Sequence, residues 1–192
     1  MANQQGNFGF RPVQMLGGAY NGQGQQEVSI ASNETNSIFQ GDPVVLNANG
    51  SISRGGSTGA ELLGIFNGCF YTDPTTSKPT FSNHYPGGIV ASDIVANVIT
   101  DPDVIFEVKV DDTNGGIAQV GSTANIATYS AGDTTSGISN VALDGSSFAT
   151  SNGSNFAVYA LTTDVENNDY TLANANILVR INKHQYRDTT GI

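Results

Sequence analysis

Histidine, cysteine and serine side chains are the first places to look for catalytic chemistry in this chain of 192 residues. Nucleophilic catalysis needs a serine or cysteine beside a general base, and a third group that orients the base. The only histidines are His84, in a proline-rich stretch, and His184, near the C-terminal end, and neither adjoins a Gly-x-Ser-x-Gly sequence. We expect both at solvent-exposed or interface positions and expect no catalytic residue.

The single cysteine, Cys69, offers little more. It cannot form an intrachain disulfide, and a zinc cluster of the usual cysteine and histidine type cannot be assembled around it. It stands in an apolar stretch between Gly68 and Phe70, which favours a buried core thiol. The sequence also lacks a phosphate-binding loop and a dinucleotide fingerprint. We therefore expect no cofactor and no metal.

Carboxylates gather at the two ends of one apolar segment, residues 104–110. A strand of that length spans about 20 Å, so Asp101 and Asp103 lie too far from Asp111 and Asp112 to act as a catalytic pair on one sugar bond. The Asp-Asp-Thr-Asn-Gly run that begins at Asp111 has oxygen ligands suited to Ca²⁺ but lacks the distal glutamate of an EF-hand. Turn formation alone explains its composition. These observations predict a protein that is not an enzyme and leave calcium binding open.

The composition indicates a turn-rich β protein. Charged residues make up 12% of the chain and glycine accounts for 23 residues, against a usual charged share of about 25%. Acidic residues outnumber basic ones by 17 to 7, for a net charge of −10, which argues against direct nucleic-acid binding. No apolar run reaches membrane-spanning length. The first residues lack the features of a signal peptide, so we expect synthesis in a cytoplasm without export by that route.

Residues 38–73 organise the predicted fold. An apolar strand over 43–46 leads to Asn49-Gly50, which is typical of a type I′ turn because both central residues need positive φ. Residues 51–54 return as a short strand with Ile52 facing inward. The next strand, 62–71, contains two glycines that indicate a bulge or bend, as in a small barrel.

The remaining pattern is also of the β type. Residues 72–88 hold three prolines and predict a long loop or a contact surface. Residues 89–99 fit a helix or a strand, and their β-branched content favours a strand. Further strands are expected at 27–31, 104–110, 117–120, 124–129, 156–161 and 177–181. We predict an all-β protein with a small antiparallel β-barrel or β-sandwich body and an extended N-terminal arm.

The predicted organisation has three parts. Residues 1–25 form the arm, residues 26–182 the body with a Ser- and Gly-rich excursion at 130–155, and residues 183–192 a polar basic tail. The arm carries Phe8, Phe10 and Arg11, and we expect it to cross a subunit boundary, with packing against its own domain as the alternative. Basic residues concentrate near the other end, and these and the arm residues are the predicted subunit or capsid contacts: Phe8, Phe10, Arg11, Arg180, Lys183 and Arg187.

Two segments carry a family resemblance. One is NFGFRPV at residues 7–13 with LGG at 16–18, and the other is FQGDPV at 39–44 followed by LGIFNGC at 63–69. Together with VRIN at 179–182, they resemble the decoration, cement or head-stabilising proteins of tailed bacteriophages, particularly those from aquatic hosts. The resemblance covers about the first 75 residues.

This resemblance implies a non-enzymatic structural protein on the exterior of a phage capsid. It implies a β body that assembles as a homo-oligomer, with a trimer expected before a dimer, and bridges subunits of the major capsid protein. The alternative is a carbohydrate-binding or adhesin-like β-sandwich, in which Tyr71, His84 and Tyr85 near one proline-rich loop would stack on sugars.

Overall fold

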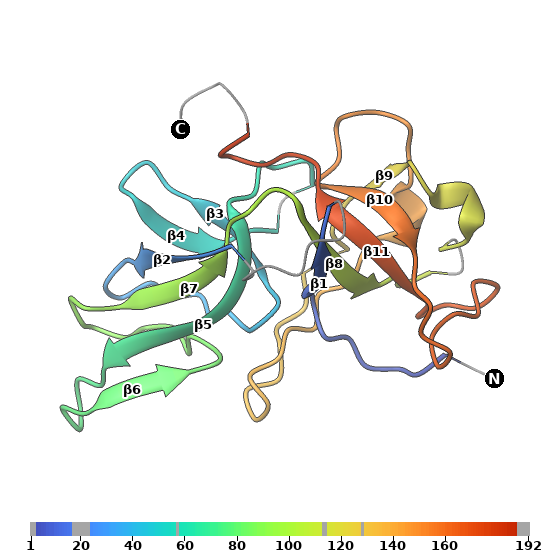
Figure 1. The fold of residues 1–192 in the computed structure, drawn as a ribbon. Helices are drawn as coiled ribbons and strands as arrows, with labels where there is room; N and C mark the ends of the chain where they lie inside the picture. Colours follow the sequence, from blue (N-terminus) through green and yellow to red (C-terminus); the bar gives the residue numbers. More distant parts are fainter. Residues whose placement is uncertain (1–2, 17–23, 57, 113–114, 128, 188–192) are drawn as a thin grey trace.

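The computed structural model describes residues 3–16, 24–56, 58–112, 115–127 and 129–187. It shows two β bodies packed side by side, a closed barrel and a second sheet (Figure 1). The prediction of an all-β protein is confirmed. The described residues hold only two short 3₁₀ helices outside the strands, η1 (Ile117–Gln119) and η2 (Gly145–Ser147).

The barrel comes from one continuous part of the chain. Its five strands are β2 (Gln25–Ile30), β3 (Pro43–Leu46), β4 (Ser51–Arg54), β5 (Gly64–Thr72) and β7 (Val95–Ile99), in the order β3-β4-β2-β7-β5. Pairing of β3 with the start of β5 closes the ring. The far half of β5 pairs instead with β6 (Pro79–Ser82), which extends beyond the ring. All pairs are antiparallel except β2 with β4.

The second sheet is antiparallel and joins both ends of the chain. Its order is β1 (Arg11–Met15), β8 (Val104–Lys109), β11 (Asn176–Ile181), β10 (Phe156–Leu161) and β9 (Thr123–Ala124). The chain therefore starts in this sheet, builds the barrel, and then returns. The barrel is in effect inserted between β1 and β8, and β1 pairs with β8 across that insertion.

Each body has its own apolar core. One cluster fills the barrel and includes Ile52, Phe66 and Val98, all fully buried. The other covers the inner face of the second sheet and takes Leu62, Ile65 and Ile99 from the barrel. The barrel therefore supplies one wall of the second core, and this shared wall holds the two bodies together.

The turn of the hairpin at residues 47–51 differs from the predicted turn type. Strands β3 and β4 and the inward position of Ile52 are confirmed. Gly50 has a φ of 80°, but Asn49 has no positive φ, and the Asn47 carbonyl accepts the Gly50 N–H. The prediction of a type I′ turn was wrong, because residues 47–50 join the strands and only Gly50 among them has a positive φ.

Of the two glycines predicted to mark a bulge or bend in the long strand, Gly68 lies in a bulge and Gly64 has another role. The β5–β7 register shifts between Phe66 and Cys69, and Gly68 in this bulge has a φ of 122°. Gly64 has an ordinary φ but lies against β7, where an added Cβ would stand 2.0 Å from the Ile99 carbonyl oxygen. Gly68 is therefore needed for the positive φ of the bulge, and Gly64 is needed because a side chain there would keep β5 and β7 apart.

Other boundaries differ from expectation. The strand favoured over 89–99 is confined to β7, and the expected 72–88 loop contains β6. Between β9 and β10, the described residues of the 130–155 excursion hold isolated bridges and η2. The predicted 104–110 strand is confirmed as β8, but all six of its residues are buried, because β1 and β11 flank it and other segments cover its outer face.

Candidate functional site

The N-terminal segment packs against its own chain. Phe10 is only 1% exposed, and its ring stacks on Phe156 at 4.1 Å between centroids. Its N–H donates to the Gly41 carbonyl at 3.0 Å. For Phe10, the prediction of a contact across a subunit boundary was wrong, because the second sheet needs this ring to complete its core.

Two glycines allow this packing. Gly9 and Gly41 have φ of 69° and 94°, and the segments that contain them cross so closely that a Cβ on Gly9 would stand 2.5 Å from the Gly41 oxygen. The Phe-Gly-Phe and Gln-Gly-Asp sequences are therefore two halves of one contact. Both glycines are visible in the sequence, but the residues around each one do not indicate that the two segments contact each other.

Arg11 lies on the surface of β1, with its side chain 59% exposed. Its guanidinium pairs with the buried carboxylate of Glu107 and stands 4.9 Å from the centre of the half-buried Phe8 ring. Glu107 also accepts hydrogen bonds from Asn176 and Thr162, at 2.9 and 3.2 Å. Arg11 and Phe8 are thus committed to contacts within the chain, although both keep exposed surface.

A second buried charge lies on the same face of β8. Lys109 is almost fully buried, and its ammonium group donates to the Gln4 carbonyl. Burial lowers the pKa of Lys109, and the charge of Asp164 opposes this effect. Asn3 and Gln4 also bond to residues 167–173. The first described residues therefore form a polar cover over β8, and the predicted arm of residues 1–25 contains both this cover and a sheet strand.

The basic residues near the C-terminal end have different environments. Lys183 donates to the Gly59 carbonyl at 2.9 Å, and Arg187 pairs with Asp103 at 2.6 Å. Arg180, half-buried on β11, has no ion pair or side-chain hydrogen bond to another described residue. Of the six predicted contact residues, Arg180 is therefore the cation whose charge has no described partner.

His184 contradicts the prediction of a solvent or interface position. It is 2% exposed, and it lies in a bridge with Leu62 that fastens residues 183–185 to the barrel. Its Nδ1 accepts the Tyr186 N–H at 3.1 Å. Burial lowers its pKa, while the Thr100 carbonyl opposes this effect. The start of the predicted tail is therefore docked; residues 188–192 lie outside the described residues.

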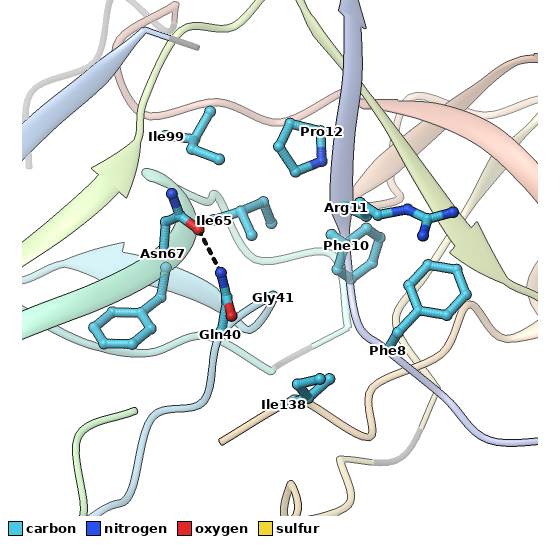
Figure 2. Close-up of a pocket in the computed structure, with 11 residues that line it drawn as sticks. Phe8, Phe10, Arg11, Pro12, Gln40, Gly41, Ile65, Asn67, Ile99 and Ile138 are labelled. Carbon is cyan, nitrogen blue, oxygen red and sulfur yellow. Dashed lines mark hydrogen bonds between the residues drawn. The ribbon is translucent and has the colours of Figure 1, made fainter. Parts of the chain in front are cut away.

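A cavity of about 230 Å³ lies where the N-terminal segment meets the barrel (Figure 2). Figure 2 shows Phe8 and Phe10 on one side and the side chains of Gln40 and Asn67 on the other. Gln40 Nε2 donates to Asn67 Oδ1 at 2.9 Å. The full lining is Phe8, Phe10, Arg11, Pro12, Gln40, Gly41, Ile65, Phe66, Asn67, Ile99 and Ile138.

Next to this cavity a buried carboxylate accepts a hydrogen bond from a phenol, and a guanidinium stacks on the ring of that phenol. Asp42 Oδ2 accepts the Tyr129 hydroxyl at 2.8 Å and the Phe39 N–H at 2.9 Å. Arg54 stacks over the Tyr129 ring at 3.6 Å. Burial raises the pKa of Asp42, against hydrogen bonds from Phe39 and Tyr129. Oδ1 lacks a hydrogen bond of good geometry, although Ser139 is close enough to stabilise the carboxylate. Sequence reasoning missed this cluster because its members are far apart in the chain.

An apolar row crosses the outside of the barrel. Phe70 on β5 lies directly opposite Val95 on β7 and Phe81 on β6. The neighbours Cys69 and Ala96 point into the core, so these three side chains share the outer face. Phe81 is 80% exposed, and its ring centre lies 4.8 Å from that of Phe70. Of the row, only Phe81 belongs to the 72–88 stretch that was predicted to be a long loop or a contact surface.

The residues proposed for sugar stacking do not form a surface. Tyr71 and Tyr85 are buried in the barrel core, and the Tyr85 hydroxyl donates to the Glu34 carbonyl at 3.1 Å. His84 stacks on Phe39. The prediction that these side chains supply a sugar-binding face was therefore wrong, because their strand and loop direct two of the three inward.

The remaining candidates for chemistry are the thiol of Cys69 and the possible calcium loop that begins at Asp111. Cys69 is buried as predicted, and burial raises the pKa of its thiol to about 12. Asp111 accepts the Gly145 N–H at 2.9 Å, while residues 113 and 114 of the calcium candidate lie outside the described residues. Within the part of the chain that the structure describes, no three His, Cys, Asp or Glu residues are grouped so as to hold a metal. None of its helices is long and apolar enough to cross a membrane.

Comparisons with known proteins give no family or fold relative. No family model, curated protein or solved structure matches this chain.

Proposed function

We propose that this protein is a non-enzymatic structural protein that decorates a viral shell, as the resemblance to phage decoration proteins implies. The observation that carries the proposal is the apolar row of Val95, Phe70 and Phe81 on the barrel. A large aromatic ring that packs against a second ring and is mostly exposed is typical of a contact site. The partner we propose is the major capsid protein, on the exterior of the virion.

The geometry favours contact through the face of the row. Lys78 and Pro79 stand at the start of the edge strand β6, and both discourage the addition of another strand along that edge. Three side chains cover far less than the roughly 800 Å² per partner of a stable complex. A single contact is therefore weak, and repetition over a symmetric shell supplies the avidity. A homo-oligomer, a trimer before a dimer, would multiply the contacts further.

The proposal is tested by co-sedimentation of purified protein with shells of the encoding virus that have been stripped of it. We expect Phe81→Ser to weaken binding by about tenfold or more, because it removes the most exposed ring of the row. The matched control is Ile117→Ser, which removes a similarly exposed apolar side chain from η1 on the other body. Unchanged binding by Phe81→Ser, or equal losses in both variants, would refute this contact site.

A further inference from the structure

The cavity beside the N-terminal segment has the size of one bulky side chain. Its volume of about 230 Å³ exceeds that of a 150 Å³ protein cavity that binds benzene, and is below the roughly 300 Å³ at which pockets for drug-sized ligands begin. Phe8 is half-buried and Ile138 partly exposed, so the cavity meets the surface on the side that these residues form. An occupant can therefore enter from outside.

The polar groups of the cavity match a peptide bond. The Gln40 and Asn67 carboxamides share one hydrogen bond, and neither side chain makes another with the described residues. Whichever amide donates in that bond, the pair keeps unused N–H and C=O groups. A peptide group offers the complementary C=O and N–H. Arg11 is neutralised by Glu107, so the lining favours an uncharged occupant.

The backbone beside the cavity is extended. Arg11 and Pro12 belong to β1, a terminal strand that pairs only with β8 among the described residues. An extended segment that enters the cavity can lie along this strand, as in recognition by strand addition. Because Pro12 lacks an N–H, pairing there is partial, and the side chain in the cavity must supply much of the affinity.

We propose that this cavity binds one uncharged, bulky apolar residue, such as phenylalanine or leucine, in an extended segment of another polypeptide. The residue's side chain occupies the space between Phe10 and Ile65, and its peptide group hydrogen-bonds to Gln40 and Asn67. This site is separate from the row that contains Phe81. It is defined by its chemistry and does not depend on a role in a viral shell.

The test is a titration of the full-length protein followed by NMR of the side-chain amides. The probes are N-acetyl-phenylalaninamide, the extended tripeptide acetyl-Gly-Phe-Gly-amide, and toluene, which has the ring alone. We expect the tripeptide to bind most tightly and to shift the Gln40 and Asn67 amide resonances. Asn67→Ala should weaken peptide binding about fivefold, since one net hydrogen bond is lost, and leave toluene binding unchanged.

The matched control is Gln119→Ala, which removes a carboxamide from η1 outside the cavity and should change no affinity. Binding of toluene alone would show a plain apolar void and overturn the proposal. Equal affinity for the tripeptide and the single amide would assign the site to small molecules and also overturn it. The absence of shifts with every probe would overturn it as well. None of these results bears on shell binding by Phe81.

Discussion

The barrel and the second sheet reach stability by different routes. All strands of the barrel come from residues 25–99, with β2 and β7 from the two ends of this segment paired to each other, and the barrel core is apolar. The second sheet pairs β1 with β8 across that whole insertion and buries Glu107 and Lys109 on one face. These charges are satisfied by residues from both ends of the chain. The comparison shows that one continuous segment supplies every strand of the barrel, whereas the second sheet needs segments from before and after that segment.

The largest effect is expected where the N-terminal segment enters the second core. Phe10→Ala removes a fully buried ring stacked on Phe156 and should lower the free energy of unfolding by about 3–5 kcal/mol. Chemical denaturation measures this loss, and hydrogen exchange should show β8 and β11 losing more protection than β4 and β7. Phe81→Ala is the control, with a change of about 0.5 kcal/mol or less. Equal loss of protection in both bodies would contradict the proposed difference.

The barrel has its own sensitive position at Gly64. An alanine there would place its Cβ 2.0 Å from the Ile99 carbonyl oxygen, and the backbone cannot give way without opening the β5–β7 pairing. We expect Gly64→Ala to cost about 2–3 kcal/mol, measured by denaturation. Gly56→Ala, where the nearest atom is 3.8 Å away, should be nearly neutral. Similar losses in the two variants would mean that the close approach is unimportant.

The buried charge on β8 gives a smaller effect. Glu107→Gln keeps the shape but removes the negative charge that pairs with Arg11 and accepts from Asn176 and Thr162. We expect a loss of about 1–3 kcal/mol. Glu27→Gln, on the exposed part of β2, is the matched control and should leave the free energy of unfolding unchanged. A variant as stable as the wild type would show that the charge of Glu107 contributes little to the stability of the second sheet.

The smallest effect concerns pH. Backbone N–H groups of Thr76 and Thr75 lower the pKa of Asp73 below its usual 3.8. Hydrogen bonds from Thr135 and Thr171 likewise lower the pKa of Asp133 and Asp169. A carboxyl group with a depressed folded-state pKa stabilises the fold above its unfolded-state value, and that stability is lost as pH falls through the folded-state value.

We therefore expect the free energy of unfolding to fall as the pH drops below about 4, with Asp42 acting in the opposite direction because burial raises its pKa. Asp73→Asn keeps the accepting oxygen of its turn and loses the titration, so denaturation as a function of pH should show a shallower acid slope. A slope identical to that of the wild type would contradict the role of this turn.

Sequence reasoning worked where the signal was local. The strand with Ile52, the glycine bulge at Gly68 and the buried thiol of Cys69 all follow from a few neighbouring residues. The burial of Glu107 and Lys109 could not be predicted, because alternation makes them outward-facing. Only the fold brings Gln4 to Lys109 and Asn176 to Glu107. His184 and Phe10 were misplaced for the same reason: each lies near a chain end whose docking site is distant in sequence.

The proposed function is most directly tested by the temperature at which shells release their DNA. Virions that carry the protein, as the proposal requires, would be stripped of it and then reconstituted with wild-type protein, Phe81→Ser or Ile117→Ser. We expect stripping to lower the release temperature, wild type and Ile117→Ser to restore it, and Phe81→Ser to fail. An unchanged release temperature after stripping would contradict the claim that this protein strengthens a viral shell.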